Sequence, residues 1–248
     1  MLQNFTKRWQ MLLALAVVVM LVALMAVLVG PQPAQAQEKT NSVVMPPILP
    51  PYGVTYGEWS ARWWQWVFSI PADKHPLLDT GGIPNGDCSV NQSGKVWFLG
   101  GTFATNGITR NCTIPAGKAL LIPVLNDIFG AAVGDCAPTG TGKCDVLKLR
   151  QGAAAWMNEA TKLTFTVDNI PVKNLRLYRA LSPVFSVRTP SSNPIFGLDP
   201  GTTYSPLVSD GYWIMLAPLP SGPHTIHFGG TIPSQSFTLD ITYHLTVK

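Results

Sequence analysis

Apolar residues recur with two different spacings along the chain, and the spacing changes at Leu163. Before it, apolar positions three and four residues apart predict helices near 58–69 and 146–160. After it, apolar and polar residues alternate, most clearly over 237–247. Such alternation is typical of a strand with one face in a core and the other in solvent. The pattern predicts a mainly β domain, an antiparallel β-sandwich or jelly roll with two packed helices.

The first predicted helix, EWSARWWQWVFS, is apolar around most of its circumference. Thr55 and Glu58 have the spacing of a capping box, in which each side chain bonds a free backbone amide at the start of the helix. Glu58, Arg62 and Gln65 share one narrow polar stripe. Because a helix this apolar is normally buried, the stripe indicates either a water-facing side or the wall of a ligand pocket.

Further strands are predicted at 95–103 and at 112–125, the second broken near Pro115. Two more, at 212–216 and 224–228, are expected to form a hairpin beside the last strand, joined through the proline-rich link between them. These strands are short and separated by turn-forming residues, as in all-β domains.

Tryptophan offers a second kind of site, because sugars stack on exposed indole rings. The four tryptophans of the first helix occur at helical spacing, which favours a place in the core. Trp97 and Trp213, both on predicted strands, are therefore the candidates for an exposed stacking surface.

The N-terminal segment has the order of a secretory signal. Lys7 and Arg8 precede an apolar run at 11–30, and the small residues Ala34 and Ala36 follow it. We expect residues 1–36 to be a signal peptide, and the protein to be secreted or periplasmic. The apolar run is also about as long as the ~20 residues that span a bilayer, so a membrane tether formed by residues 11–30 is the alternative. In both cases the rest of the chain lies outside the cytoplasm.

The chain after the signal divides into a proline-rich, extended lead-in at 37–54 and a single β-rich domain at 55–248. Only 12% of residues are charged, while Gly and Pro number 22 each, which favours a turn-rich β protein. The formal net charge of +4 falls further when the signal is removed. It is too small to indicate a nucleic-acid partner, and contact with a membrane is expected only if the signal segment is uncleaved.

Four cysteines in an exported chain predict two disulfides. Proximity favours Cys88 with Cys112 and Cys136 with Cys144, and the other two pairings stay open. No two cysteines have the close spacing of a structural zinc site, so no metal is predicted, and no cofactor motif is present.

No nucleophile elbow, phosphate-binding loop or dinucleotide fingerprint occurs in the sequence, and its acidic residues are scattered. We expect an extracytoplasmic module that binds a carbohydrate or another cell-surface or envelope component without catalysis. The alternative is a secreted hydrolase acting on a polysaccharide, with Glu58 or Asp127 as the acid or base. The candidate pocket residues are Glu58, Arg62, Gln65, Asp127, Trp97 and Trp213.

Two segments, YGEWSARWWQW at 56–66 and CTIPAGKALLIPVLN at 112–126, resemble a group of uncharacterised secreted bacterial proteins. The resemblance covers most of the chain after the signal. It implies a bacterial, exported setting, and it implies no activity and no catalytic residue.

Overall fold

The computed structural model describes residues 43–78, 88–104, 107–136 and 144–248. The predicted signal peptide, the alternative tether and the first part of the lead-in lie outside the described residues. A compact unit spans residues 40–248. Within the described ranges, no helix is long and apolar enough to cross a bilayer.

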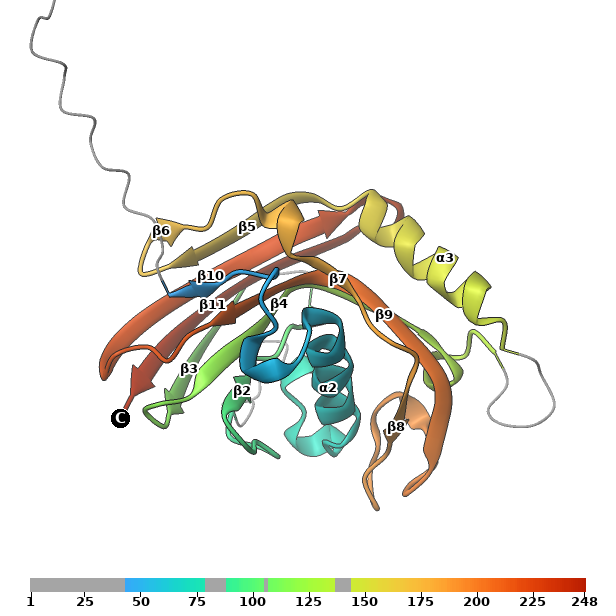
Figure 1. Cartoon of the computed structure of the whole chain (residues 1–248). Helices are drawn as coiled ribbons and strands as arrows, with labels where there is room; N and C mark the ends of the chain where they lie inside the picture. The colour runs from blue at the N-terminus through green and yellow to red at the C-terminus, as the bar shows by residue number, and fades with distance from the viewer. Residues whose placement is uncertain (1–42, 79–87, 105–106, 137–143) are drawn as a thin grey trace, which may run out of the picture. The chain divides into compact units, whose positions relative to one another are not determined.

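Strands dominate the described part of the chain and form one six-stranded and one five-stranded sheet (Figure 1). Sheet A has the order β1-β9-β4-β2, with two short strands, β7 and β8, also paired with β9. Its strands are β1 Val44–Met45, β2 Val96–Phe98, β4 Ala119–Gly130, β7 Arg179–Leu181, β8 Phe185–Arg188 and β9 Thr203–Leu216. Sheet B has the order β3-β11-β10-β5-β6, and its strands are β3 Ile108–Ile114, β5 Thr161–Val167, β6 Ile170–Pro171, β10 Gly222–Ile232 and β11 Phe237–Val247.

The predicted class, a mainly β sandwich with two packed helices, is confirmed. The strand pairs are antiparallel except for two, β2 with β4 and β3 with β11, which are parallel. The helices are α2 Tyr56–Phe68 and α3 Val146–Asn158, each within about two residues of its predicted bounds.

The predicted hairpin between 212–216 and 224–228 is wrong. β9 pairs with β1, β4, β7 and β8, whereas β10 pairs with β5 and β11, so the link between β9 and β10 crosses from sheet A to sheet B. The link carries Leu219, which is buried in the core between the sheets. An apolar side chain inside the link favours this crossing over a tight, polar hairpin turn.

Sheet A is covered on both faces. Ile214 and Leu216 of β9 join the core between the two sheets, while Trp213 and Met215 join a second core with α2. α2 thus packs on the face of sheet A that points away from sheet B (Figure 1). Burial on both faces explains why these strands are continuous apolar runs in the sequence rather than alternating ones.

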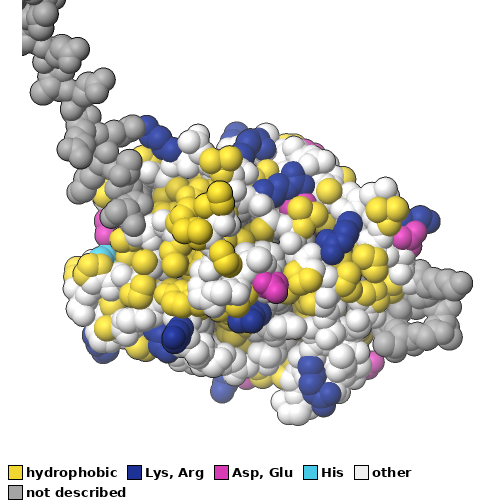
Figure 2. Space-filling model, viewed as in Figure 1, with side chains coloured by type: hydrophobic (Ala, Val, Ile, Leu, Met, Phe, Trp, Pro, Cys, Tyr) yellow, Lys and Arg dark blue, Asp and Glu magenta, His cyan; other side chains and the backbone are white. Residues whose placement is uncertain are grey.

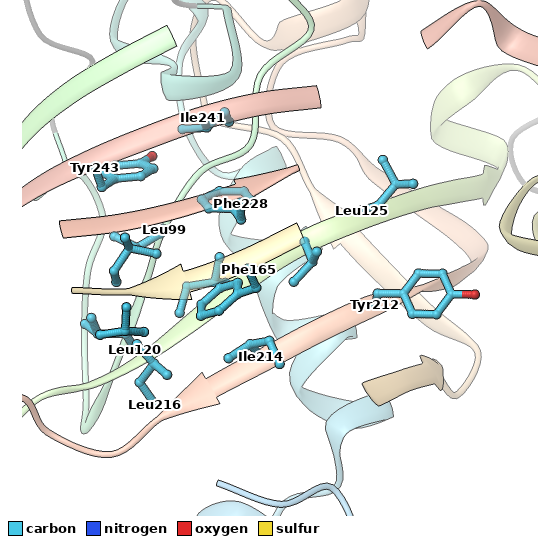
Figure 3. Close-up of a cluster of buried hydrophobic side chains, with 14 of the residues drawn as sticks. Leu99, Leu120, Leu125, Phe165, Tyr212, Ile214, Leu216, Phe228, Ile241 and Tyr243 are labelled. Atoms are coloured by element: carbon cyan, nitrogen blue, oxygen red, sulfur yellow. The ribbon is translucent and has the colours of Figure 1, made fainter. Parts of the chain in front are cut away.

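Figure 3 shows the core between the sheets, where Ile214 of sheet A lies near Phe165 and Phe228 of sheet B. The ring of Phe228 stacks on that of Tyr243, with centroids 6.1 Å apart and planes 6° from parallel. β11 alternates between this core and solvent along its whole length, as its sequence predicts.

The predicted capping box at the start of α2 is present. The Glu58 amide donates to Thr55 Oγ1 over 3.2 Å, and the Thr55 amide donates to Glu58 Oε2 over 2.9 Å. At Gly57 a Cβ atom would lie 2.2 Å from the carbonyl oxygen of Leu181, so only glycine lets the helix approach β7 this closely. Helix α2 is therefore fixed both at its first turn and against sheet A.

Both predicted disulfides are confirmed, Cys88 with Cys112 and Cys136 with Cys144. Paired cysteines are typical of proteins that fold in an oxidising, extracytoplasmic environment.

Candidate functional site

The six candidate residues do not lie together in the folded protein. Arg62 and Gln65 line one concavity, Asp127 lines another, and Glu58 lines neither of these two. Trp97 and Trp213 are buried. The candidates thus define two sites rather than one.

The prediction that Trp97 and Trp213 offer a stacking surface is wrong. Their exposed fractions are 7% and 0%. Trp213 packs edge-on against Trp63 of α2, with ring centroids 5.4 Å apart, and Trp97 lies in the core between the sheets. The physical reason is the cover on both faces of sheet A, which leaves these strands no water-facing side. The tryptophans of α2 are buried as predicted.

Glu58 acts as a helix cap. Its carboxylate accepts hydrogen bonds from the amide and the hydroxyl of Thr55, both over 2.9 Å. These bonds lower the pKa of Glu58 below its ordinary value, with a smaller contribution from Arg62. A carboxylate held in the ionised form at the surface is a poor proton donor, which argues against Glu58 as a general acid.

The first concavity, which we call the α2 groove, has a volume of about 540 Å³ and lies beside the polar stripe of α2. Its apolar lining includes the rings of Tyr52, Trp59, Trp66 and Phe98. Its polar lining is Arg62, Gln65, Asn91, Ser93 and Lys95, without an acidic residue among the described residues that line it.

The groove is partly organised by its own contacts. The guanidinium carbon of Arg62 lies 4.8 Å from the centre of the Trp59 ring, within the range of a cation–π interaction. Gln65 Nε2 donates to the carbonyl of Ser186 over 3.1 Å, and Asn91 Nδ2 donates to the carbonyl of Ser69 over 3.0 Å. Both amides are thus oriented.

The second concavity, which we call the β4 cavity, has a volume of about 370 Å³. It lies along the second half of β4, where β2 no longer pairs with that strand. It is lined by Trp64, Phe103, Asn126, Asp127, Ile128, Phe129, Val133, Asp135, Trp156, Phe196, Ile232, Gln235 and Phe237.

Asp127 is the perturbed acid of the β4 cavity, with an exposed fraction of 5%. It pairs across the sheet with Asp210, whose amide donates to Asp127 Oδ1 over 3.3 Å. Burial raises the pKa of Asp127 to about 8, and the nearby Asp210 and Asp135 carboxylates add to the rise, while the Asp210 amide and Arg179 oppose it. Asp127 is therefore mostly protonated at neutral pH.

Asp210 differs from its neighbour because it has a cationic partner. The guanidinium of Arg179 donates to both Asp210 oxygens, over 3.0 Å from Nε and 2.7 Å from Nη2. These hydrogen bonds raise the pKa of Arg179. Sequence reasoning missed this pair, because β7 and β9 meet only in the folded sheet.

Two buried polar residues outside both sites have structural roles. Arg110 donates to the carbonyls of Gly100 and Gly101 and to the Tyr243 hydroxyl, which ties β3 to a loop. His75 is 3% exposed, and burial lowers its pKa to about 4. Neither reaches the α2 groove or the β4 cavity.

Exposed apolar residues do not add a third site. On the face seen in Figure 2, hydrophobic side chains gather in a larger and a smaller group, with Lys and Arg at their margins. The most exposed of the large apolar side chains are Ile48, Leu177, Leu49 and Leu147. Exposed apolar side chains are common on soluble domains, and nothing in the structure identifies an occupant for these.

A scan of the chain against protein-family models found no match, and a search of curated proteins found none either. Among solved structures, similarity was found to a chain of the structure titled "Structure of PbICP-C in complex with falcipain-2". The identity is 13% and the TM-score 0.25, and the match covers 62% of this chain and 100% of that chain. A similarity this low supports no conclusion about fold or function.

Proposed function

We propose that this protein is an extracytoplasmic binding module whose α2 groove recognises a carbohydrate. One observation carries the proposal: the only polar stripe of an otherwise buried tryptophan-rich helix opens on a groove that combines aromatic rings with oriented amide and cationic groups. Sugars need this combination, because their C–H faces stack on rings and their hydroxyls require several hydrogen-bond partners.

The groove has the parts for both kinds of contact. The side chain of Tyr52 is 43% exposed and lies at the surface of the groove. The Gln65 and Asn91 amide nitrogens are engaged with backbone carbonyls, which leaves their carbonyl oxygens as acceptors for sugar hydroxyls. Arg62 and Lys95 add positive charge to the groove. None of the described residues that line it is acidic, so this charge is not neutralised there. The groove therefore favours sugars that carry a carboxylate or sulfate.

The test is a glycan array and a cell-wall pull-down with purified protein, compared with a denatured control. We expect binding to acidic glycans, and Arg62→Gln to weaken it at least about tenfold, since a hydrogen bond to a charged group is worth about 1.5–3 kcal/mol. Arg188→Gln is the matched control, because Arg188 is also an exposed arginine and does not line the groove. The absence of binding above the denatured control, or equal loss in both variants, would remove the proposal.

Export is part of the same proposal. The two disulfides support an oxidising compartment, and the N-terminal pattern supports processing after Ala36. Mass measurement of the protein recovered from cells tests it: a chain that starts at Gln37 means release, and an intact apolar run means a tether.

Hydrolysis of a polysaccharide is the second candidate, favoured by one observation, the raised pKa of Asp127. Such chemistry needs a second carboxyl across a cleft from the first. The carboxylate facing Asp127 across the sheet, that of Asp210, is fully buried and bonded to Arg179. Release of reducing ends from acidic and neutral polysaccharides, lost in Asp127→Asn, would favour the hydrolase over the binding module.

A further inference from the structure

The β4 cavity joins aromatic rings with acids and is independent of the α2 groove. Six aromatic rings line it, and the charged groups among its described lining residues are two carboxyls, Asp127 and Asp135, without a Lys, Arg or His. Two of the rings are about half exposed, Phe103 at 45% and Phe196 at 49%, with their centroids 5.6 Å apart. The residues that build this cavity are therefore suited to a ligand that is not an anion.

Phe196 is held at this site by an unusual backbone conformation. Its φ angle is 59°, in the left-handed region that bulky residues rarely adopt. Strained residues of this kind cluster at functional sites, where the surrounding structure holds them in place. The ring of Phe196 also lies against those of Phe68 and Phe103, with centroid distances of 5.9 and 5.6 Å, so neighbouring side chains hold it in place.

Asp127 is an unsatisfied group within the cavity wall. Its Oδ1 accepts from the Asp210 amide, whereas its buried Oδ2 has no hydrogen-bond partner among the described residues. A buried polar atom without a partner carries the full cost of losing its hydrogen bonds to water. A ligand that donates a hydrogen bond to Oδ2 would recover this cost.

The charges around Asp127 favour a cation. Asp210 faces it from β9, and that carboxylate is neutralised by Arg179 of β7. Asp135 lines the same cavity and accepts a hydrogen bond from the Gly130 amide. When Asp127 loses its proton, these four groups sum to two negative charges, and no described lining residue compensates them.

We propose that the β4 cavity binds an organic ammonium ion, a primary amine carried on a small apolar or aromatic body. The ammonium group donates to Asp127, and the rings enclose the body and attract the charge through their faces. The volume of about 370 Å³ lies at the small end of the ~300–1,000 Å³ range of ligand pockets, which suits an amine with a single ring or a short chain.

Proton release follows from this assignment. The unliganded cavity holds its proton on Asp127, whose pKa is about 8, and the incoming ammonium takes the place of that proton, which passes to solvent. Affinity for a fixed cation therefore rises with pH, by about ninefold between pH 6 and pH 7 and about fivefold between pH 7 and pH 8, and then levels off. A primary alkyl amine stays protonated through this range, because such an amine, like the lysine side chain, has a pKa of about 10.

The experiment is isothermal titration of protein purified from cells that express the full chain, with phenethylamine as the probe and 2-phenylethanol as its uncharged counterpart. We expect the amine to bind, the alcohol to bind at least tenfold more weakly at pH 8, and the amine affinity to follow the pH profile above. Asp127→Asn should abolish the pH dependence and weaken amine binding at least tenfold. Asp240→Asn is the matched control, since Asp240 is an exposed acid on the outer face of sheet B, and it should bind like the parent.

Three results would overturn the assignment: no amine binding at pH 8.5, equal binding of the amine and the alcohol, or an affinity that falls as pH rises through 8. The last would mean that the cavity binds its ligand best while Asp127 is protonated, which an ammonium bound to the carboxylate does not allow. If Asp127→Asn does not fold, Phe196→Ala replaces it, because a half-exposed ring can be removed without opening the core. Glycan binding in the α2 groove is measured on the same variants, so the two sites can fail separately.

Discussion

Asp127→Asn should change how the stability of the protein depends on pH. Asparagine keeps the shape of the side chain and can still accept the hydrogen bond of the Asp210 amide, but it cannot ionise. In the folded parent the carboxyl titrates at about 8, against 3.8 for an unperturbed aspartate. Between these values the folded state holds a proton that the unfolded state has lost, so the free energy of unfolding falls as pH rises. The stabilisation that comes from the raised pKa of Asp127 is therefore fully present below about pH 4, falls as pH rises, and is gone once pH has passed through 8.

The magnitude follows from the size of the pKa shift. Each pH unit within this window is worth about 1.4 kcal/mol, so the parent should lose about 4 kcal/mol relative to Asp127→Asn between pH 5 and pH 8. For a domain of this size that difference amounts to about 8–16 °C in melting temperature. The parent alone would not isolate this effect, because buried His75, with a pKa of about 4, makes the free energy of unfolding rise with pH below 6.5. Asp127→Asn also contains His75, so the difference between the two proteins cancels that contribution.

The assay is urea unfolding of both proteins at half-unit steps from pH 4.5 to pH 9, with Asp240→Asn as the control for loss of an exposed carboxylate. We expect the difference between the variant and the parent to grow steadily up to about pH 8 and then to stay constant. A difference that is flat over the whole range would show that Asp127 is ionised in the folded state, and the reasoning on both its burial and its ligand would fail.

Three further changes test other parts of the structure. Thr55→Ala removes the cap of α2 and should lower the free energy of unfolding by about 1 kcal/mol in urea, with no change in the denaturant slope. Trp213→Ala opens a cavity in a fully buried site and should cost about 3–5 kcal/mol, whereas Phe196→Ala, at a half-exposed ring, should cost far less. His75 must gain a proton in a buried site on acidification, so the parent should lose about 3 kcal/mol relative to His75→Asn as pH falls from 6.5 to 4. Equal acid sensitivity of the parent and His75→Asn would contradict the buried neutral histidine.

Features with local causes could be predicted from the sequence. The capping box depends on Thr55 and Glu58 alone, and the faces of β11 depend on strict alternation, so both are as expected. The two disulfides follow the shortest separations, 24 and 8 residues. Each of these features is decided within a short stretch of chain, before any distant element has to be placed.

The path of the chain between the sheets could not be predicted in this way. The apolar run at 212–216 has the same composition whether it lies in a hairpin or in the middle of a sheet covered on both sides. Helix α2 decides which of these two positions the strand takes, although it lies far earlier in the chain. Trp64 Nε1 of α2 donates to Ser209 Oγ of β9, across a separation of 145 residues. Because α2 needs an apolar face to pack on, β9 becomes a central strand of sheet A and not the partner of β10.

The β4 cavity depends on an irregularity that periodicity conceals. Before the register shift between Pro123 and Leu125, the odd-numbered residues of β4 face α2, as Leu121 does. After it, Leu125 joins the core between the sheets, so the odd-numbered residues have changed face. A regular strand would have placed Asp127 on the α2 side, opposite Ser209, whereas the shift pairs it with Asp210. One inserted residue thus places two carboxyls side by side and raises the pKa of one of them, which makes this bulge the structural origin of the proposed ammonium site.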